Sequence, residues 1–184
     1  MARLILPNGG EITEVAPIVA RLAALGITLR HWPAPRDPRA QMLMAQESLT
    51  TEEQEELLAR VENRFQEIQQ EGGYTTRDLV VIHENMPNRA SLLARFEAIH
   101  IHTDDEVRYV LSGGGYFGFV DEEGQFLVEV EQGDYVNVPT QVEHWFTMGN
   151  HDRIKAVRYF IDTTGWTPVY SGRLRLFDGT RPHN

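Results

Sequence analysis

The sequence predicts a mainly β fold, a β-barrel with N-terminal helices packed outside it. Residues 98–170 are dense in β-branched and aromatic residues, and glycine-containing turns divide them into short segments, as in a sandwich or barrel. Residues 1–97 instead mix helical patterns with short strands. Because the chain has 184 residues and no long linker, we expect a single domain over residues 1–184 with one sizeable core.

The N-terminal part begins with a predicted strand at residues 3–6, which a Pro-Asn-Gly-Gly turn ends. Apolar residues then recur at helical spacing over residues 12–25, and a glycine ends this helix. Residues 27–32 are predicted to form a strand, and the proline-containing residues 33–40 a loop.

The clearest helix is predicted at residues 51–70. Thr50 and Glu53 form a capping-box signal at its start, and apolar residues make one stripe along it. Such a stripe indicates a helix packed on a core. Residues 79–83 follow as a predicted strand and residues 90–96 as a short helix.

The second part alternates predicted strands with turns. The predicted strands are residues 98–102, 107–112, 116–120, 126–130, 135–138, 144–147 and 155–161. The run Gly113-Gly114-Gly115 between two of them is interpreted as a bend of the barrel. No Lys-Ser/Thr pair or helix start follows it, as a phosphate-binding loop would require.

Composition and charge exclude several classes of function. The absence of cysteine excludes disulfides, thiolate nucleophiles and cysteine-type metal sites, so imidazole and carboxylate would have to hold any metal. The net charge of −10 argues against nucleic-acid and membrane partners. The sequence has no apolar run of ~20 residues and no signal-peptide pattern, so a cytoplasmic location is expected.

Residues 100–106, His-Ile-His-Thr-Asp-Asp-Glu, form a candidate metal site. On a strand, His100 and His102 point to the same side, and Glu106 lies four residues further on. Two imidazoles and one carboxylate leave open positions for substrate and dioxygen, as in non-heme Fe(II) oxygenases. An antiparallel meander can return His144 beside them. The alternative is that these are ordinary strand histidines, and spacing alone supports only the first three residues as ligands.

The order of these residues resembles the two motifs of the cupins. The matching positions are His100, His102, Glu106 and Gly113 in the first motif, and Gly133, Pro139 and His144 in the second. Ala94 and Gln141 stand where cupins usually have glycine. Both are expected at turns, where a barrel absorbs such changes.

Within the cupins, the chain resembles the acireductone dioxygenases of methionine salvage. The resemblance rests on HIHTDDEVRYVLSGGGYFGF, GDYVNVPTQVEHWFTMG and AVRYFIDTTGW, and it covers most of residues 79–170. The Asp-Asp-Glu-Val-Arg-Tyr and His-Trp-Phe segments are more specific than the general cupin pattern.

This resemblance implies a jelly-roll barrel in which His100, His102, Glu106 and His144 hold one Fe(II) or Ni(II) ion per chain. The implied substrates are the aci-reductone 1,2-dihydroxy-5-(methylthio)pent-1-en-3-one, bound as its dianion, and O2. The Fe form would yield formate and 4-methylthio-2-oxobutanoate, and the Ni form formate, carbon monoxide and 3-methylthiopropanoate. A monomer is the expected state.

The resemblance also assigns roles to two arginines and an aspartate. On spacing alone Arg108 is a surface residue, whereas the resemblance makes it a catalytic cation that helps form and hold the substrate dianion. Arg158 lies among apolar residues, where an anionic substrate could supply its counter-charge, and the resemblance makes it substrate-binding. Asp105 is either a turn residue or a catalytic residue that relays conformational change near the metal.

Three aromatic residues and one aliphatic residue complete the candidate site. Phe96, Phe146 and Trp166 match positions that line the pocket around the thioether tail of the substrate, although ordinary core packing explains them equally well. Ile99 stands where the family commonly has an acidic residue associated with metal incorporation, so the metal preference of this chain is open.

Two other functions remain compatible with the sequence. One is a different cupin dioxygenase acting on another enolised substrate, and the other is a non-catalytic cupin that binds a metal or ligand. The His-Trp-Phe segment and the two arginines favour the aci-reductone reaction over both.

Overall fold

The computed structural model describes residues 2–162 and 167–176, in which antiparallel strands form a continuous sheet with two wings. The strands are β1 (Arg3–Ile5), β2 (Glu11–Ile12), β3 (Thr28–His31), β4 (Thr76–Ile82), β5 (His100–Ile101), β6 (Glu106–Asp121), β7 (Gly124–Glu131), β8 (Asp134–Val138), β9 (His144–Thr147), β10 (Ile154–Phe160) and β11 (Val169–Tyr170). The helices are α1 (Val15–Ala24), α2 (Pro38–Ala45), α3 (Thr51–Ala59), α4 (Glu62–Gly72) and α5 (Arg89–Glu97).

Both wings contain the long strand β6. The first wing has the order β11-β5-β9-β6-β7-β1-β2, and the second has the order β4-β10-β6-β8-β3. The two wings share one apolar cluster, in which Phe117 and Val128 of the first wing lie with Val110, Val136 and Ile154 of the second. The predicted mainly β barrel is therefore confirmed.

Side chains alternate between the two faces of the second wing. On β6, Arg108 and Val110 face the interior between the wings, while Tyr109 and Leu111 face outward into a second apolar cluster. On β10, Arg158 faces inward in the same way. This is the two-residue period of a strand that is covered on both faces. It places charged residues of β6 and β10 inside the barrel.

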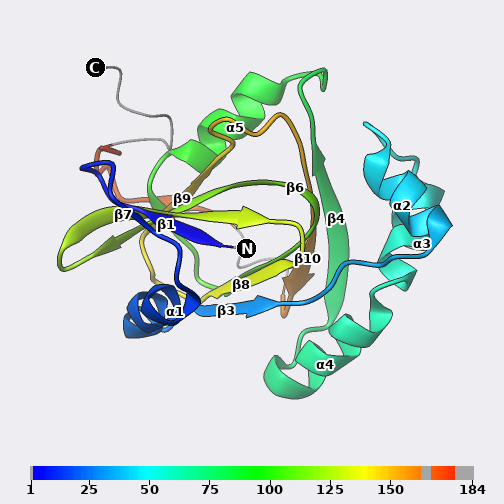
Figure 1. The fold of residues 1–184 in the computed structure, drawn as a ribbon, viewed down its shortest axis with the longest axis horizontal. Helices are drawn as coiled ribbons and strands as arrows, with labels where there is room; N and C mark the ends of the chain where they lie inside the picture. The colour runs from blue at the N-terminus through cyan, green and yellow to red at the C-terminus, as the bar shows by residue number, and fades with distance from the viewer. Residues whose placement is uncertain (1, 163–166, 177–184) are drawn as a thin grey trace.

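The helices cover the outside of the barrel, as predicted. Figure 1 shows α2, α3 and α4 gathered beside β4, with α1 near β3 and α5 at the top of the view. Leu43 of α2, Leu57 of α3 and Phe65 of α4 share the second apolar cluster with Tyr109 and Tyr159. The N-terminal helices and the barrel are thus joined by common apolar burial.

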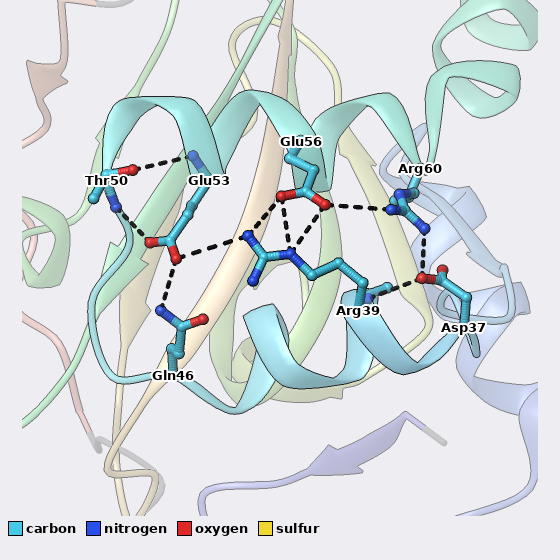
Figure 2. Close-up of polar contacts among 8 residues, drawn as sticks. Asp37, Arg39, Gln46, Thr50, Glu53, Glu56 and Arg60 are labelled. Atoms are coloured by element: carbon cyan, nitrogen blue, oxygen red, sulfur yellow. Dashed lines mark hydrogen bonds and ion pairs between the residues drawn. The ribbon is translucent and has the colours of Figure 1, made fainter.

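Hydrogen bonds and ion pairs connect α2 to α3 and cap the start of α3 (Figure 2). The predicted capping box is present, since Thr50 accepts from the Glu53 N–H and Glu53 accepts from the Thr50 N–H. Glu53 also accepts from Gln46 at 3.1 Å, and Arg39 makes a bidentate pair with Glu56, with Nη2 2.7 Å from Oε2. These groups are half-exposed, so the apolar residues beneath them carry most of the stability of this contact.

Two predictions for the N-terminal part are wrong. Residues 38–40, expected in a loop, begin α2, because Asp37 caps the N–H of Ala40 and Pro38 occupies the first helical position, where its missing N–H costs nothing. The helix expected at residues 51–70 is two helices, α3 and α4, with a break at Arg60 and Val61. The apolar spacing continues across the break, so the stripe could not reveal it.

The glycine run bends β6 but does not interrupt it. Gly113 has a φ of +72°, and a Cβ there would lie 2.1 Å from the carbonyl oxygen of Arg153. The register with β10 shifts by one residue between Lys155 and Ala156, as expected at a bulge. The two strands predicted on either side are therefore one strand. β11 was not predicted.

Within the described ranges, the helices lack the combination of length and apolar character needed to cross a bilayer.

Candidate metal centre

Neighbouring strands of the first wing carry the candidate ligands. His100 lies on β5, Glu106 begins β6 and His144 begins β9, while His102 lies between β5 and β6. β5 is held between β9 and β11, and His100 is paired in register with His144. β9 also pairs with β6, which places His144 opposite Phe119. The meander thus brings all four residues together.

The ligand atoms of the four residues converge on one point. They lie within 4.8 Å of one another, and all four residues are buried. Oε2 of Glu106 is 3.0 Å from Nε2 of His102 and 3.2 Å from Nε2 of His144. The rings of His100 and His144 are 4.6 Å apart. Three imidazoles and one carboxylate suit a divalent transition-metal ion.

Backbone carbonyls orient two of the imidazoles. Nδ1 of His100 is 2.7 Å from the carbonyl oxygen of Ala98, and Nδ1 of His144 is 2.8 Å from that of Val142. Because a carbonyl oxygen can only accept, each Nδ1 carries the proton and donates. This leaves Nε2 of each ring as the atom that can bind a metal, and Nε2 of His144 lies 3.2 Å from Oε2 of Glu106.

The charges at the site are those that metal binding requires. Burial lowers the pKa of His100 to about 4, so its imidazole is neutral near pH 7. Burial alone would raise the pKa of Glu106, but Arg108 and the adjacent imidazoles hold it well below its usual range. Nη2 of Arg108 lies 3.0 Å from Oε1 of Glu106, which leaves Oε2 directed at the histidines. The residues therefore fit a divalent cation.

A cavity of about 280 Å³ adjoins the four ligands between the two wings. Its polar end consists of the ligands with Arg108 and Arg158. Its other walls are mostly apolar, and they include Val80, Ile82, Leu92, Phe96, Val110, Phe117, Phe146, Ile154, Ala156 and Pro168. Such a cavity can hold a small molecule that has oxygen atoms at one end and an apolar tail at the other.

Four charged side chains form two ion pairs across the second wing, with the two arginines next to each other. Arg108 is buried beside Glu106 and lies opposite Arg158 on β10, which lies opposite Asp78 on β4. Nε of Arg158 donates to Oδ1 of Asp78 at 2.7 Å, and Nη2 donates to Oδ2. Burial, with a contribution from Arg158, lowers the pKa of Arg108 to about 10, so Arg108 remains charged near neutral pH.

The ion pair with Asp78 corrects the expectation for Arg158. Its counter-charge is the carboxylate of Asp78, so an anionic substrate is not needed to neutralise it. Asp78 was missed because it precedes the predicted strand at residues 79–83, whereas β4 begins at Thr76. Its pairing with Arg158 depends on the register of two strands far apart in the sequence.

The remaining predicted residues occupy different places. Phe96 and Phe146 line the cavity, and Trp166 lies outside the described residues. Asp105 is outside the set of described residues that line the cavity. Its Oδ1 accepts from the N–H of Thr140 at 3.2 Å, so it connects the ligand loop to the turn before His144.

Ile99 points away from the cavity into an apolar cluster with Tyr116, Leu127 and Trp145. It is 2% exposed and lies on the opposite face of the chain from His100. Its carbonyl oxygen accepts from the N–H of Ser171, which follows β11. The side chain therefore packs behind the ligand strand.

The two departures from the cupin motifs differ in kind. Ala94 lies within α5, so the expectation of a turn there is wrong. Gln141 does lie in a turn, with a φ of +68°, a left-handed conformation that favours glycine. Both its backbone N–H, at 3.2 Å, and its Nε2, at 3.4 Å, donate to the carbonyl oxygen of His102. These bonds offset the strain and tie the turn to a ligand.

Known proteins are similar to this chain in sequence and in fold. The profile of the ARD/ARD′ family matches residues 31–168. The acireductone dioxygenase of Microcystis aeruginosa strain NIES-843 is 45% identical over 172 residues, which cover 93% of each chain. That of Leptospira biflexa is 41% identical over 159 residues, covering 86% of this chain and 89% of the relative. The structure described as acireductone dioxygenase from Bacillus anthracis with a cadmium ion in its active centre aligns with a TM-score of 0.82 at 31% identity. This alignment covers 92% of this chain and 98% of that one.

Proposed function

The chain belongs to the ARD/ARD′ family of acireductone dioxygenases, and from this premise we propose how its cavity holds the substrate and one divalent ion. Membership makes it a dioxygenase with a cupin-type fold and a place in methionine salvage. The observation that carries the proposal is the position of the four-residue cluster, at the end of a cavity that also contains arginines and an apolar wall.

His100, His102, Glu106 and His144 would hold Fe(II) or Ni(II), one ion per chain. When bound, the ion would accept the enediol oxygens as ligands, and its positive charge would favour their deprotonation. The relative from Bacillus anthracis carries a divalent ion, cadmium, in its active centre. Imidazole and carboxylate ligands suit both proposed metals.

Arg108 and Arg158 would stabilise the negative charge of the bound substrate. Arg108 is buried and already directs its guanidinium at Glu106, so little reorganisation is needed when charge develops beside it. Arg158 is half-buried, and Asp78 fixes the plane of its guanidinium through two hydrogen bonds. Asp78 acts as a positioning residue in this proposal.

The apolar wall would receive the methylthioethyl tail. Phe96 and Phe146 lie on this wall with aliphatic residues of the second wing, and together they exclude water from the tail. Trp166, which lies outside the described residues, is proposed to contribute to substrate binding. Asp105 is proposed to hold the loop of His102 against the turn that precedes His144, through its bond to Thr140.

The metal loaded is proposed to select the products. The Fe(II)-loaded protein would convert the aci-reductone and O2 into formate and 4-methylthio-2-oxobutanoate. The Ni(II)-loaded protein would convert them into formate, carbon monoxide and 3-methylthiopropanoate. The side chain of Ile99, where relatives commonly carry an acid, is proposed to affect which metal is incorporated, because it packs directly behind His100.

The test uses apoprotein reloaded separately with each metal. The aci-reductone is added anaerobically, O2 is admitted, and the products are identified by NMR and by gas analysis for carbon monoxide. We expect substrate loss much faster than in buffer, with carbon monoxide from the Ni form alone. If neither form exceeds buffer while each holds one ion, the site acts on a different substrate and the proposal is wrong.

We further propose a cytoplasmic monomer that folds as one domain. All four ligands and the cavity arginines come from one chain, so the site is complete without a second copy. The shared apolar cluster joins the N-terminal helices to the barrel. Light scattering coupled to size exclusion should give the mass of one chain, and a larger mass would contradict the monomer. Cell fractionation tests the location, and recovery in a membrane fraction would contradict it.

A further inference from the structure

One wall of the cavity is a helix face that carries an arginine. Leu92, Arg95 and Phe96 of α5 all line the cavity, at the three- and four-residue spacing of one helix face. Leu92 and Phe96 are half-buried, whereas Arg95 is exposed. A residue that lines the cavity and is also exposed lies where the cavity meets solvent. Arg95 therefore stands at the cavity entrance.

Arg95 differs in its partners from the two inner arginines. Arg108 is paired with Glu106, and Arg158 is paired with Asp78. Among residues 2–162 and 167–176, no carboxylate lies within 4.0 Å of the Arg95 guanidinium. The charge of Arg95 is thus available to a ligand.

Even the nearest acidic residue along the helix is engaged elsewhere. Oε1 of Glu97 accepts from the Thr147 hydroxyl at 3.0 Å, and Oε2 lies 3.6 Å from Nη1 of Arg175. Glu97 therefore does not neutralise the cavity entrance through Arg95.

The charge of the whole chain makes this arginine significant. A net charge of −10 repels an anion that approaches from solvent. The cavity reverses that field locally, because three arginines and one carboxylate line it. We propose that Arg95 is a recruiting residue, which draws the anionic enediolate to the cavity entrance and passes it inward to Arg108 and Arg158. This rests on the function proposed above, because an uncharged substrate would gain nothing from it.

A purely structural role for Arg95 makes a different prediction. The residue lies in the last turn of α5, where a cation stabilises the helix dipole. That role would change thermal stability but not the Michaelis constant or its salt dependence. The two roles can therefore be separated by measurement.

The test compares Arg95→Gln, Arg95→Lys and the control Arg36→Gln in metal-loaded protein. Arg36 is exposed, lies outside the cavity lining and, like Arg95, has no carboxylate within 4.0 Å in the described part of the chain. Steady-state rates with the aci-reductone are measured at about 0.01 M and about 1 M salt, where the screening lengths are roughly 30 and 3 Å.

At low salt we expect Arg95→Gln to lower kcat/KM about 5- to 10-fold, since the entrance loses one positive charge that attracts the anionic enediolate. The loss should be in KM with kcat unchanged, should disappear at high salt, and should be largely restored in Arg95→Lys. Arg36→Gln should stay within about 2-fold of wild type.

A second readout does not need turnover. Oxalate, a non-reacting dianion, is titrated into the metal-loaded variants by calorimetry at both salt concentrations. We expect its dissociation constant to rise for Arg95→Gln at low salt only. If Arg95→Gln differs from Arg36→Gln in neither kcat/KM nor oxalate affinity, or changes only the melting temperature, the recruiting role is wrong. If wild type fails to turn over the aci-reductone while oxalate binding depends on Arg95, the recruiting role stands and the proposed reaction fails.

Discussion

Lys155 is the only lysine of the sequence, and the structure buries it to 2% exposure. Its Nζ donates to the carbonyl oxygen of Met44 at 3.2 Å and to that of Gln46, both at the C-terminal end of α2. This contact joins the N-terminal helices to β10. Burial lowers the pKa of Lys155 from 10.5 to about 8, and Arg153 adds to the effect while Glu47 opposes it.

The lowered pKa makes stability depend on pH with a defined sign. Between pH 8 and 10.5 the folded chain has already released the proton of Lys155, whereas the unfolded chain still binds it. Because the unfolded state then binds more protons, the free energy of unfolding rises with pH in this window. From pH 7 to pH 9 the contribution of this residue is about 1.3 kcal/mol.

The variant Lys155→Met removes the titrating group and keeps most of the side-chain volume. Urea unfolding of wild type and variant in a chelating buffer, followed by tryptophan fluorescence at pH 7, 8 and 9, gives the two pH profiles. We expect wild type to gain about 1.3 kcal/mol relative to the variant over this range. Titrations shared by the two proteins cancel in the difference.

A direct measurement complements the unfolding data. With lysine labelled at ¹³Cε, the protein gives one lysine signal, whose chemical shift should titrate with a midpoint near pH 8. A midpoint at 10 or above, or parallel unfolding profiles for wild type and variant, would refute the reasoning from burial.

Three further predictions follow from other parts of the structure. His100→Ala should lower the bound metal well below one ion per chain in elemental analysis, and an unchanged stoichiometry would remove His100 from the ligands. Gln141→Gly should be more stable to urea than Gln141→Ala by about 1 kcal/mol, since both lose the side-chain bond to His102 but only glycine relieves the positive φ; equal stabilities would contradict the strain. In the same assay, Leu57→Ala should cost roughly 3 kcal/mol and Arg39→Gln less than about 1 kcal/mol, because Leu57 is fully buried whereas the pair of Arg39 is half-exposed; the reverse order would show that ion pairs hold α2 to α3.

Local patterns predicted the parts of the site that lie close together in the sequence. The alternation of a strand places His100 and His102 on one side. Spacing alone made Arg108 a surface residue, and only the family resemblance predicted its place in the cavity lining. The capping box of Thr50 and Glu53 was also predictable from the sequence, because its two hydrogen bonds join residues three positions apart. Local patterns did not predict the helix ends or the break near Val61. Residues on both sides of that break pack in the same apolar cluster with residues of the sheet.

Contacts between distant segments required the fold. The pairing of Arg158 with Asp78 depends on the register of β10 and β4, and a shift by one residue would turn both side chains to the other face. The left-handed Gln141 is tolerated because its amide reaches the carbonyl oxygen of His102 in another loop. Neither contact can be predicted from residue spacing within one segment, because each joins residues far apart in the sequence.

The sequence by itself determined that this protein is mainly β, that it lacks thiol chemistry, and that imidazole and carboxylate would have to hold any metal, because composition and short-range periodicity are properties of the chain alone. Only the tertiary structure decided which charges face one another in the cavity. It pairs Arg108 with Glu106 and Arg158 with Asp78, and it leaves Arg95 at the entrance without a carboxylate partner in the described residues. Electrostatic interactions depend on distance and burial in space, and these are set when strands remote in sequence pair and exclude water.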